Sequence, residues 1–309
     1  MNDWLQARQQ GLSSSDLAAI LGRSEHRSPW MVARQKLGLE GEKAVERTED
    51  MYWGDAMEPL VATAWANRKG ANLFEPHGVD APAGIACTFL DGARRRAMYF
   101  NRDAPILRST PDYLATLGGR LGIVEVKTTG QWARWDDGIP KATWLQCQWH
   151  MLCSGLAVCW LPVLLFGKRR VLRAYELELD PAFAGADSKA GRFALDWWDK
   201  HIVRGLPVTP CHLDIPYLTR THPAGDGKTV VLSAAQATLD TQFVETAATL
   251  TTARKAHKAA SQAHRSVQAQ LRLAIADATF AEFAGGTAVL YSLTSGPLGK
   301  GRVLRRKAR

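Results

Sequence analysis

The spacing of apolar residues changes along the chain from a helical period to short runs, and then back to a helical period. In the N-terminal part apolar residues recur three and four positions apart, with serines and glycines at the expected helix ends. From Leu73 to Val126 the apolar runs are short and are broken by Gly and Pro, which is typical of strands. We expect helices over residues 17–21, 30–36, 51–68, 141–156, 181–204 and 233–277, strands over 97–100, 113–116, 121–127, 158–166 and 171–179, and a hairpin over 279–293.

The strand expected over 121–127 carries two charged residues in an otherwise apolar run. Successive side chains of a strand point to opposite faces, so Glu125 and Lys127 share one face while Val124 and Val126 face a core. Thr110-Pro111-Asp112 stands upstream of this run. A Glu and a Lys that alternate with valines also fit a half-exposed strand with a surface ion pair, so the triplet alone leaves both interpretations open.

Asp112 and Glu125 are the residue types that hold a hard divalent cation. Mg²⁺ is usually bound by one or two carboxylates, with water and substrate phosphate oxygens completing its shell. A neighbouring lysine can orient the attacking water and offset the charge that builds on a phosphate. The pattern Pro-Asp, spacer, Glu-x-Lys therefore indicates metal-dependent cleavage of a phosphodiester.

Composition and charge favour a polyanionic partner and argue against a membrane protein. The chain has 309 residues, of which 46% are hydrophobic and 22% charged, and its net charge is +9. No apolar run is long enough to span a bilayer, and the N-terminus lacks the order of a signal peptide, so we expect a cytoplasmic protein. The five cysteines contain no C-x-x-C pair and indicate neither a disulfide framework nor a zinc site.

The chain divides into two parts at a segment rich in Gly and Pro, residues 205–210. We expect an α/β nuclease domain over 1–210 and, over 211–309, a helical extension with a terminal hairpin and a basic tail from Lys300 to Arg309. Ser233 and Gln236 form a capping-box start for the long helix. Its apolar stripe is thin, so its middle is expected to be exposed or to contact a partner.

Four local patterns follow one another in order. They are Arg8-x-x-Gly11-x-x-x-Ser15-Asp16, Trp53-Gly54-Asp-Ala-Met-Glu58, Thr110-Pro-Asp112 with Glu125-x-Lys127, and Gln146-x-Gln148-x-x-Met151. Together this set resembles the YqaJ-like and phage lambda exonuclease-type branch of the PD-(D/E)xK nucleases over roughly residues 8–165. The resemblance implies a mixed central sheet flanked by helices, with the site at one edge.

The resemblance also implies roles for individual residues. Asp112, Glu125 and the main-chain carbonyl of Val126 would bind Mg²⁺, with Mn²⁺ able to substitute, and Glu58 would join them directly or through water. Lys127 would orient or help to deprotonate the attacking water. The glutamine of the pattern matches Gln146, whereas Gln148 and His150 are secondary candidates.

A second group of residues corresponds to the pocket in which lambda-type enzymes hold a terminal 5′-phosphate. Arg8 would bind the phosphate as a fork, Ser15 would add a hydroxyl, and Thr110 stands where those enzymes often have a serine. The alternative is that Ser15 or Asp16 only caps a helix. Trp132 and Trp135 lie among polar residues and are candidates for DNA contact.

By resemblance the protein would be a magnesium-dependent 5′→3′ exonuclease of phage or prophage origin. It would resect double-stranded DNA ends for recombination by single-strand annealing, beside an annealing protein and as a homo-oligomeric ring. Three alternatives remain open: a structure-dependent endonuclease with the same site, a DNA-binding or scaffolding protein that has lost catalysis, and an adaptor for a replication or annealing partner whose main functional part is the C-terminal segment.

Overall fold

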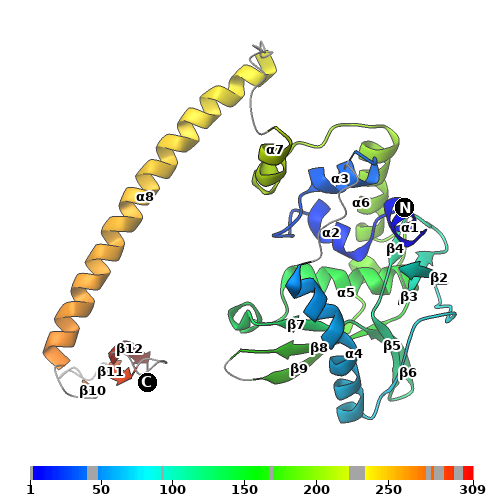
Figure 1. Cartoon of the computed structure of the whole chain (residues 1–309), viewed down its shortest axis with the longest axis horizontal. Coiled ribbons are helices and arrows are strands. Elements are labelled where there is room, and N and C mark those ends of the chain that lie inside the picture. The colour runs from blue at the N-terminus through cyan, green and yellow to red at the C-terminus, as the bar shows by residue number, and fades with distance from the viewer. Residues whose placement is uncertain are drawn as a thin grey trace. The chain divides into compact units, whose positions relative to one another are not determined.

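The computed structural model describes residues 3–39, 48–91, 94–167, 170–222, 234–275, 280–281, 289–295 and 302–308. The chain forms two compact units, Met1–Ala224 and Gly225–Arg309 (Figure 1). The helices and helical turns of the first unit are α1 (Asp3–Gln9), α2 (Ser14–Ile20), α3 (Pro29–Lys36), α4 (Glu49–Lys69), η1 (Trp132–Trp135), α5 (Lys141–Ser154), η2 (Pro181–Phe183), α6 (Lys189–Trp198), η3 (Asp199–Val203), η4 (His212–Asp214) and α7 (Ile215–Thr221). Its strands are β1 (Asn72–Phe74), β2 (Gly84–Asp91), β3 (Arg94–Asn101), β4 (Arg108–Ser109), β5 (Tyr113–Leu117), β6 (Arg120–Val124), β7 (Lys127–Thr129), β8 (Val158–Leu165) and β9 (Val171–Glu178).

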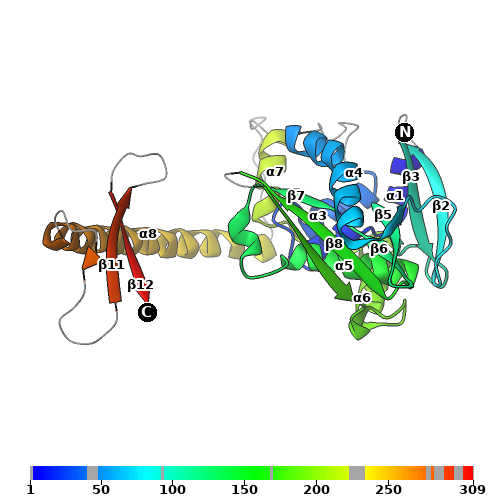
Figure 2. The same ribbon diagram turned by 90° about the horizontal axis from the view of Figure 1, so that it is seen from below.

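A mixed six-stranded sheet forms the centre of the first unit. Its order is β1-β5-β6-β8-β7, with β9 also paired to β8. Strands β6 and β7 run parallel to β8, while the other pairs are antiparallel. Helix α4 covers one face and α5 the other (Figure 2). The expected mixed sheet flanked by helices is therefore confirmed.

The alternation of side chains along β6 explains why two different helices can cover the sheet. Ile123 belongs to the core that includes Met151 of α5, whereas Val124 belongs to the core that includes Val61 and Trp65 of α4. Both residues of β6 are fully buried. A sheet buried on both faces holds its strands firmly, because each side chain on either face is fixed by packing.

The strand expected over 121–127 is present, but it is interrupted at Glu125 and Val126. Ile123 and Lys127 keep the same register against Cys159 and Val163 of β8, so β6 and β7 follow one line. In that register the residue opposite Val126 is Pro162, which has no N–H to donate. Glu125 N–H still donates to the Trp160 carbonyl at 3.0 Å, and the ladder is broken one step later, where Pro162 has no N–H to donate in return.

A smaller three-stranded sheet, β2-β3-β4, leads the chain into the site. The turn between α1 and α2 pairs with the segment before β4, since Leu12 N–H donates to the Ile106 carbonyl and Arg108 N–H donates to the Leu12 carbonyl. The chain then runs from β4 through Thr110 and Pro111 to Asp112. This pairing joins the N-terminal helices to the segment that carries the first carboxylate.

Two expected helices differ from the structure. Helix α4 buries Val61 and Trp65 as expected, but Leu60 and Ala64 are exposed, because the helix presents Ala62 and Ala66 to the sheet in their place. The expected helix 181–204 is broken after η2. It begins again at Lys189, where the Ser188 side chain accepts a hydrogen bond from the backbone N–H of Gly191 and caps α6.

The second unit contains α8 (Ala234–Ile275) and the small sheet β10-β11-β12, formed by Phe280–Ala281, Val289–Ser295 and Arg302–Ala308. Strand β12 pairs antiparallel with β11, so most of the expected basic tail is a strand. Ser233, Gly285, Gly286, Lys300 and the basic turn residues 168–169 lie outside the described residues. Among the helices of the described ranges, none has the length and apolar character needed to cross a bilayer.

Candidate active site

Asp112, Glu125 and Lys127 meet where β4, β6 and β7 end or begin. The backbone N–H of Glu125 faces β8, so the N–H of the next residue, Val126, points to the opposite side, where it donates to Asp112 Oδ2 at 2.8 Å. Lys127 Nζ lies 2.5 Å from Glu125 Oε1. The bond from Val126 N–H to Asp112 thus connects the Pro-Asp segment to the Glu-x-Lys segment, and the three side chains of the sequence motif lie together.

Helix α5 supplies two further contacts to Glu125. Gln146 Nε2 donates to Glu125 Oε1 at 2.6 Å, and His150 Nε2 lies 3.2 Å from Glu125 Oε2. Gln146 and His150 are four residues apart and therefore share one face of the helix. His150 and Oε2 are close but are not aligned for a hydrogen bond, and both are buried. The side chain of Glu125 is therefore held from α5 through Gln146, with His150 beside it, and from its own strand through Lys127.

The two carboxylates differ in their expected charge. Burial acts to raise the pKa of Glu125, but Lys127 and His150 outweigh it and lower that pKa to about 2. Burial raises the pKa of Asp112 well above its usual value, and the charges of Glu125 and Glu58 raise it further. Burial acts to lower the pKa of Lys127, but the two carboxylates outweigh it and raise that pKa. The site thus holds more negative charge than Lys127 alone can balance.

Glu58 projects from α4, which packs beside β7 and β8. It is half-buried, and its negative charge contributes to the raised pKa of Asp112. Helix α4 begins at Thr48, whose side chain accepts from Met51 N–H, and it ends at Gly70 in the left-handed conformation. Three acidic side chains from three separate segments therefore act on one region.

This set of donors fits a small divalent cation by its chemistry. Glu125 Oε2 is buried and has no hydrogen-bond partner, and Asp112 is held close to two other acids. Mg²⁺ needs only one or two protein carboxylates, with waters and phosphate oxygens as further ligands. Within the described ranges no three His, Cys, Asp or Glu side chains are already arranged around one point as a metal cage.

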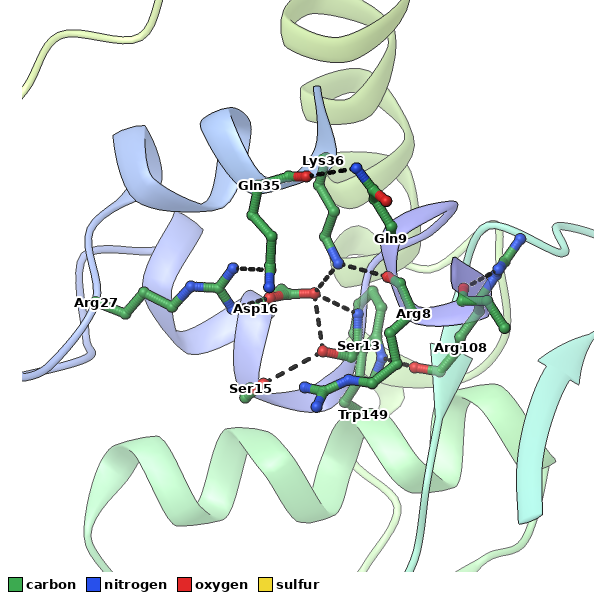
Figure 3. Close-up of polar contacts among 11 residues, drawn as sticks. Arg8, Gln9, Ser13, Ser15, Asp16, Arg27, Gln35, Lys36, Arg108 and Trp149 are labelled. Carbon is green, nitrogen blue, oxygen red and sulfur yellow. Dashed lines mark hydrogen bonds and ion pairs between the residues drawn. The ribbon is translucent and has the colours of Figure 1, made fainter. Parts of the chain in front are cut away.

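Arg8, Ser13 and Ser15 lie together at the turn between α1 and α2 (Figure 3). The figure shows the Arg8 side chain extending toward both serines, and the Ser13 and Ser15 hydroxyl oxygens are 3.2 Å apart. Ser15 is exposed and Arg8 is half-buried. Asp16 caps α2 by accepting from Ser13 N–H at 2.8 Å, so the capping interpretation is correct for Asp16 and leaves the Ser15 hydroxyl at the surface.

Thr110 lies between this turn and the carboxylates. It is half-buried and follows β4, whose Arg108 pairs with Leu12 in the α1–α2 turn. Trp149 of α5 donates from Nε1 to the Arg108 carbonyl at 2.8 Å (Figure 3). The same helix therefore contacts Glu125 through Gln146 and supports the α1–α2 turn through Trp149.

The remaining candidate residues of the sequence lie in different environments. Trp135 is 5% exposed and packs against Tyr175 in the core, so its ring is not available to DNA. Trp132 keeps partial exposure and donates from Nε1 to the Phe166 carbonyl at 2.7 Å. Gln148 is buried and clamps the end of β9, where it donates to the Glu178 carbonyl and accepts from Asp180 N–H.

Two residues, His150 and Lys36, make contacts with buried carboxylates that their sequence context does not indicate. His150 was a secondary candidate, yet it contacts Glu125; the signal was its spacing of four residues from Gln146. Lys36 is buried against Asp16 at 2.8 Å. A lysine at the end of an amphipathic helix normally reaches into solvent, so the sequence contains no sign of this contact.

Comparison with known proteins identifies the family. The YqaJ-like viral recombinase domain matches residues 3–157, half of the chain. The chain is 23% identical to the uncharacterized protein YqaJ of Bacillus subtilis (strain 168) over 209 residues, which cover 66% of this chain and 57% of that protein. The chain therefore spans less than two thirds of the length of that relative.

Two solved structures resemble the chain more distantly. An alkaline exonuclease from Laribacter hongkongensis has a TM-score of 0.47 at 18% identity, covering 72% of this chain and 97% of the other. A phage-related exonuclease from Haemophilus somnus has a TM-score of 0.40 at 13% identity, covering 65% and 99%. On the domain match, the chain belongs to the family of the YqaJ-like viral recombinase domain.

Proposed function

We propose that this protein is a magnesium-dependent deoxyribonuclease that hydrolyses phosphodiester bonds of duplex DNA from its ends. One observation supports the proposal: Asp112, Glu125 and Lys127 form a single cluster, with Val126 N–H bound to Asp112 and Lys127 bound to Glu125. An ordinary half-exposed strand would put Glu125 at the surface, whereas here it is 1% exposed. Burying several acids close together is costly unless cations offset their charge, so this cluster indicates a site for a cation.

In this proposal Asp112, Glu125 and the Val126 carbonyl hold Mg²⁺ or Mn²⁺, and Glu58 joins them directly or through water. The ion, when bound, lowers the pKa of water and stabilises charge on the phosphate. Lys127 orients the attacking water and offsets charge on the phosphate oxygens. Gln146 and His150 hold the carboxylate of Glu125 in its orientation from α5.

The direction of digestion follows from the phosphate pocket that we assign to Arg8, Ser15 and Thr110. These residues lie on two segments that are paired through Leu12 and Arg108, and Arg8 and Ser15 face one another (Figure 3). A pocket for a terminal 5′-phosphate would make the enzyme a 5′→3′ exonuclease. We extend the proposal to recombination by annealing, with a single-strand annealing protein as partner, with a homo-oligomeric ring around DNA, and with the host cytoplasm as the place of action.

The proposal is tested by digesting linear duplex DNA with 5′-phosphates in Mg²⁺ and in EDTA. Lys127→Met removes the charge but keeps the length of the side chain, and we expect it to lower the rate at least about 100-fold. Lys69→Met, at the exposed end of α4, is the matched control and is expected to digest like wild type. Digestion that continues in EDTA, or in Lys127→Met at the wild-type rate, would refute the assignment.

Covalently closed circles separate the alternatives. An exonuclease leaves them intact, so cutting of circles would indicate the endonuclease. A protein that binds duplex DNA but cleaves neither substrate would be the inactive DNA-binding or adaptor alternative. The intact set of Asp112, Glu125 and Lys127 favours the exonuclease over that inactive protein.

A further inference from the structure

A buried carboxylate lies directly behind the proposed phosphate pocket. The side chain of Asp16 is fully buried on α2 (Figure 3). Its Oδ2 lies 2.8 Å from Lys36 Nζ and accepts from both the N–H and the hydroxyl of Ser13, each at 2.8 Å. Its Oδ1 accepts from Arg27 at 2.5 Å. Simple capping of a short surface helix would need only the bond to Ser13.

The contacts of Lys36 extend from Asp16 to the residue that bears the phosphate-binding side chain. Lys36 Nζ also donates to the carbonyl of Arg8 at 2.7 Å. The carbonyl of the preceding residue, Ala7, accepts from Arg108. The last turn of α1 is thus held by two cations that donate to its otherwise unpaired carbonyls. Gln9 adds a bond to the Gln35 carbonyl at 3.1 Å, so α3 is tied to α1 at two points.

Ser13 carries the connection in the other direction. Its hydroxyl donates to Asp16 and lies 3.2 Å from the hydroxyl of Ser15. Asp16 therefore reaches Arg8 through Lys36 and Ser15 through Ser13, so the two residues assigned to the phosphate depend on one carboxylate.

The local charge also suits an anion. The charges of Lys36, Arg27 and Arg8 act on one another within this cluster, and burial together with Arg27 and Arg8 holds the pKa of Lys36 below its usual value despite Asp16. Lys36 and Arg27 pair with the single carboxylate of Asp16 and leave an excess of positive charge beside Arg8, which suits an end phosphate with about two negative charges.

We infer that Asp16 is a positioning residue for the terminal 5′-phosphate: with Lys36 and Ser13 it fixes the turn that presents Arg8 and Ser15. This inference rests on the proposed function, because it assumes that the substrate is a DNA end. Asp16 does not touch the phosphate in this account. It acts by holding the side chains of Arg8 and Ser15 at a fixed separation, so that the pocket is already in its binding geometry before the phosphate binds.

The test uses the full-length protein and the double variant Asp16→Asn/Lys36→Met. Removing both charges avoids the uncompensated buried charge that either single change would leave. Binding of duplexes with 5′-phosphate or 5′-hydroxyl ends is measured in EDTA, which separates end recognition from cleavage. We expect the double variant to bind the phosphorylated end about tenfold more weakly and the hydroxyl end as wild type does.

Digestion in Mg²⁺ provides the second measurement. We expect KM for phosphorylated ends to rise by about tenfold while kcat changes by less than about twofold. Gln148→Leu, which breaks the buried clamp at the end of β9, is the control for a general loss of stability. It is expected to lower the melting temperature and to leave the phosphate preference unchanged.

The outcomes are distinct. A folded double variant with the wild-type preference for phosphorylated ends would overturn the inference, as would an equal loss of binding to both kinds of end. If the wild-type protein binds phosphorylated and hydroxyl ends equally, the phosphate pocket is refuted. If the wild-type protein has no nuclease activity, the proposed function is refuted. The inference fails in either case. If circular dichroism shows that the double variant is unfolded, Arg27→Gln replaces it, since Arg27 is 23% exposed and Asp16 keeps Lys36. A preference that falls by about threefold then supports the inference, and an unchanged one overturns it.

Discussion

The buried carboxylates of this molecule differ in the charge that their surroundings favour. Glu125 is charged because Lys127 and His150 outweigh its burial, while Asp112 has no such excess of positive partners and its pKa is raised. Asp16 resembles Glu125: burial acts to raise its pKa, but Lys36 and Arg27 outweigh it and hold that pKa well below the usual value. A buried acid with two cationic partners therefore links stability to pH in a definite direction.

Asp16 should make the first unit less stable in acid. Its pKa in the folded state is lower than in the unfolded chain, where it is about 3.9. The stabilisation is therefore complete only above about pH 5 and is lost as the pH falls from there toward the folded pKa. We expect the free energy of unfolding, measured with urea at pH 7, 5 and 3.5, to fall between the last two values, and to fall less in Asp16→Asn/Lys36→Met.

The desolvation of Lys36 limits how much this pair contributes at neutral pH. Burial, together with the charges of Arg27 and Arg8, lowers the pKa of Lys36 despite the attraction of Asp16, so part of that attraction is offset. Asp16→Asn alone leaves the lysine buried without its partner and should cost about 3–5 kcal/mol. The double variant Asp16→Asn/Lys36→Met should lose clearly less free energy of unfolding than Asp16→Asn alone. If Asp16→Asn and the double variant lost the same free energy of unfolding at pH 7, the loss would come from the missing ion pair and not from the unpaired charge of Lys36.

Glycines in two different elements should respond in opposite ways to a methyl group. A Cβ at Gly122 of β6 would lie 2.4 Å from Val158 Cγ1 and 2.9 Å from the Val158 carbonyl oxygen. Because β6 is buried on both faces, the neighbours cannot move away easily. We expect Gly122→Ala to lower the free energy of unfolding by about 1–3 kcal/mol.

Gly54 of α4 provides the matched control. A Cβ there meets no atom within 4 Å, and the residue lies inside a helix. Gly54→Ala should therefore raise the free energy of unfolding by about 0.5–1 kcal/mol, since alanine is the better helix former. Urea unfolding at neutral pH measures both changes. Destabilisation by Gly54→Ala would show that the start of α4 is not the regular helix described above.

The sequence predicts elements well where one physical signal dominates. The apolar period and the capping residues predict α3, α4 and α5 almost to their ends, and the two strand-like runs on either side of the basic turn 167–170 predict β8 and β9. The face of α4 was harder to predict, because small alanines at 62 and 66 pack closer to the sheet than Leu60 does. Apolar size alone does not reveal which side of such a helix is buried.

The site is predictable only in part for a similar reason. Motif spacing finds Asp112, Glu125 and Lys127, but it does not find the break in the strand, since that break depends on Pro162 in a strand that comes later in the chain. The contacts of Lys36 with Asp16 and Arg8 likewise join three helices. Contacts of this kind exist only after the elements have packed, so no local pattern reports them.

At the scale of the whole chain, the first unit extends beyond the boundary expected at residue 210. Helix α7 and the turn before it belong to it. The Ser28 hydroxyl donates to Asp214 Oδ1 at 2.5 Å, and Asp214 is fully buried. Tyr217 packs edge to face against Trp30, with ring centroids 5.6 Å apart, and its hydroxyl accepts a hydrogen bond from Arg34 at 2.9 Å. These contacts secure α3, the helix that carries Lys36.

Two truncations should therefore behave differently. The fragment 1–224 keeps Asp214 and Tyr217, and we expect it to unfold at the temperature of the first unit in the full chain and to digest linear DNA. The fragment 1–210 leaves Ser28 and Arg34 without these partners, which should cost roughly 1–3 kcal/mol for the unpaired buried groups alone. Calorimetry and the nuclease assay measure both effects. Equal stability of the two fragments would show that α7 does not support α3, whereas loss of cleavage in a folded 1–224 fragment would mean that the second unit takes part in the reaction.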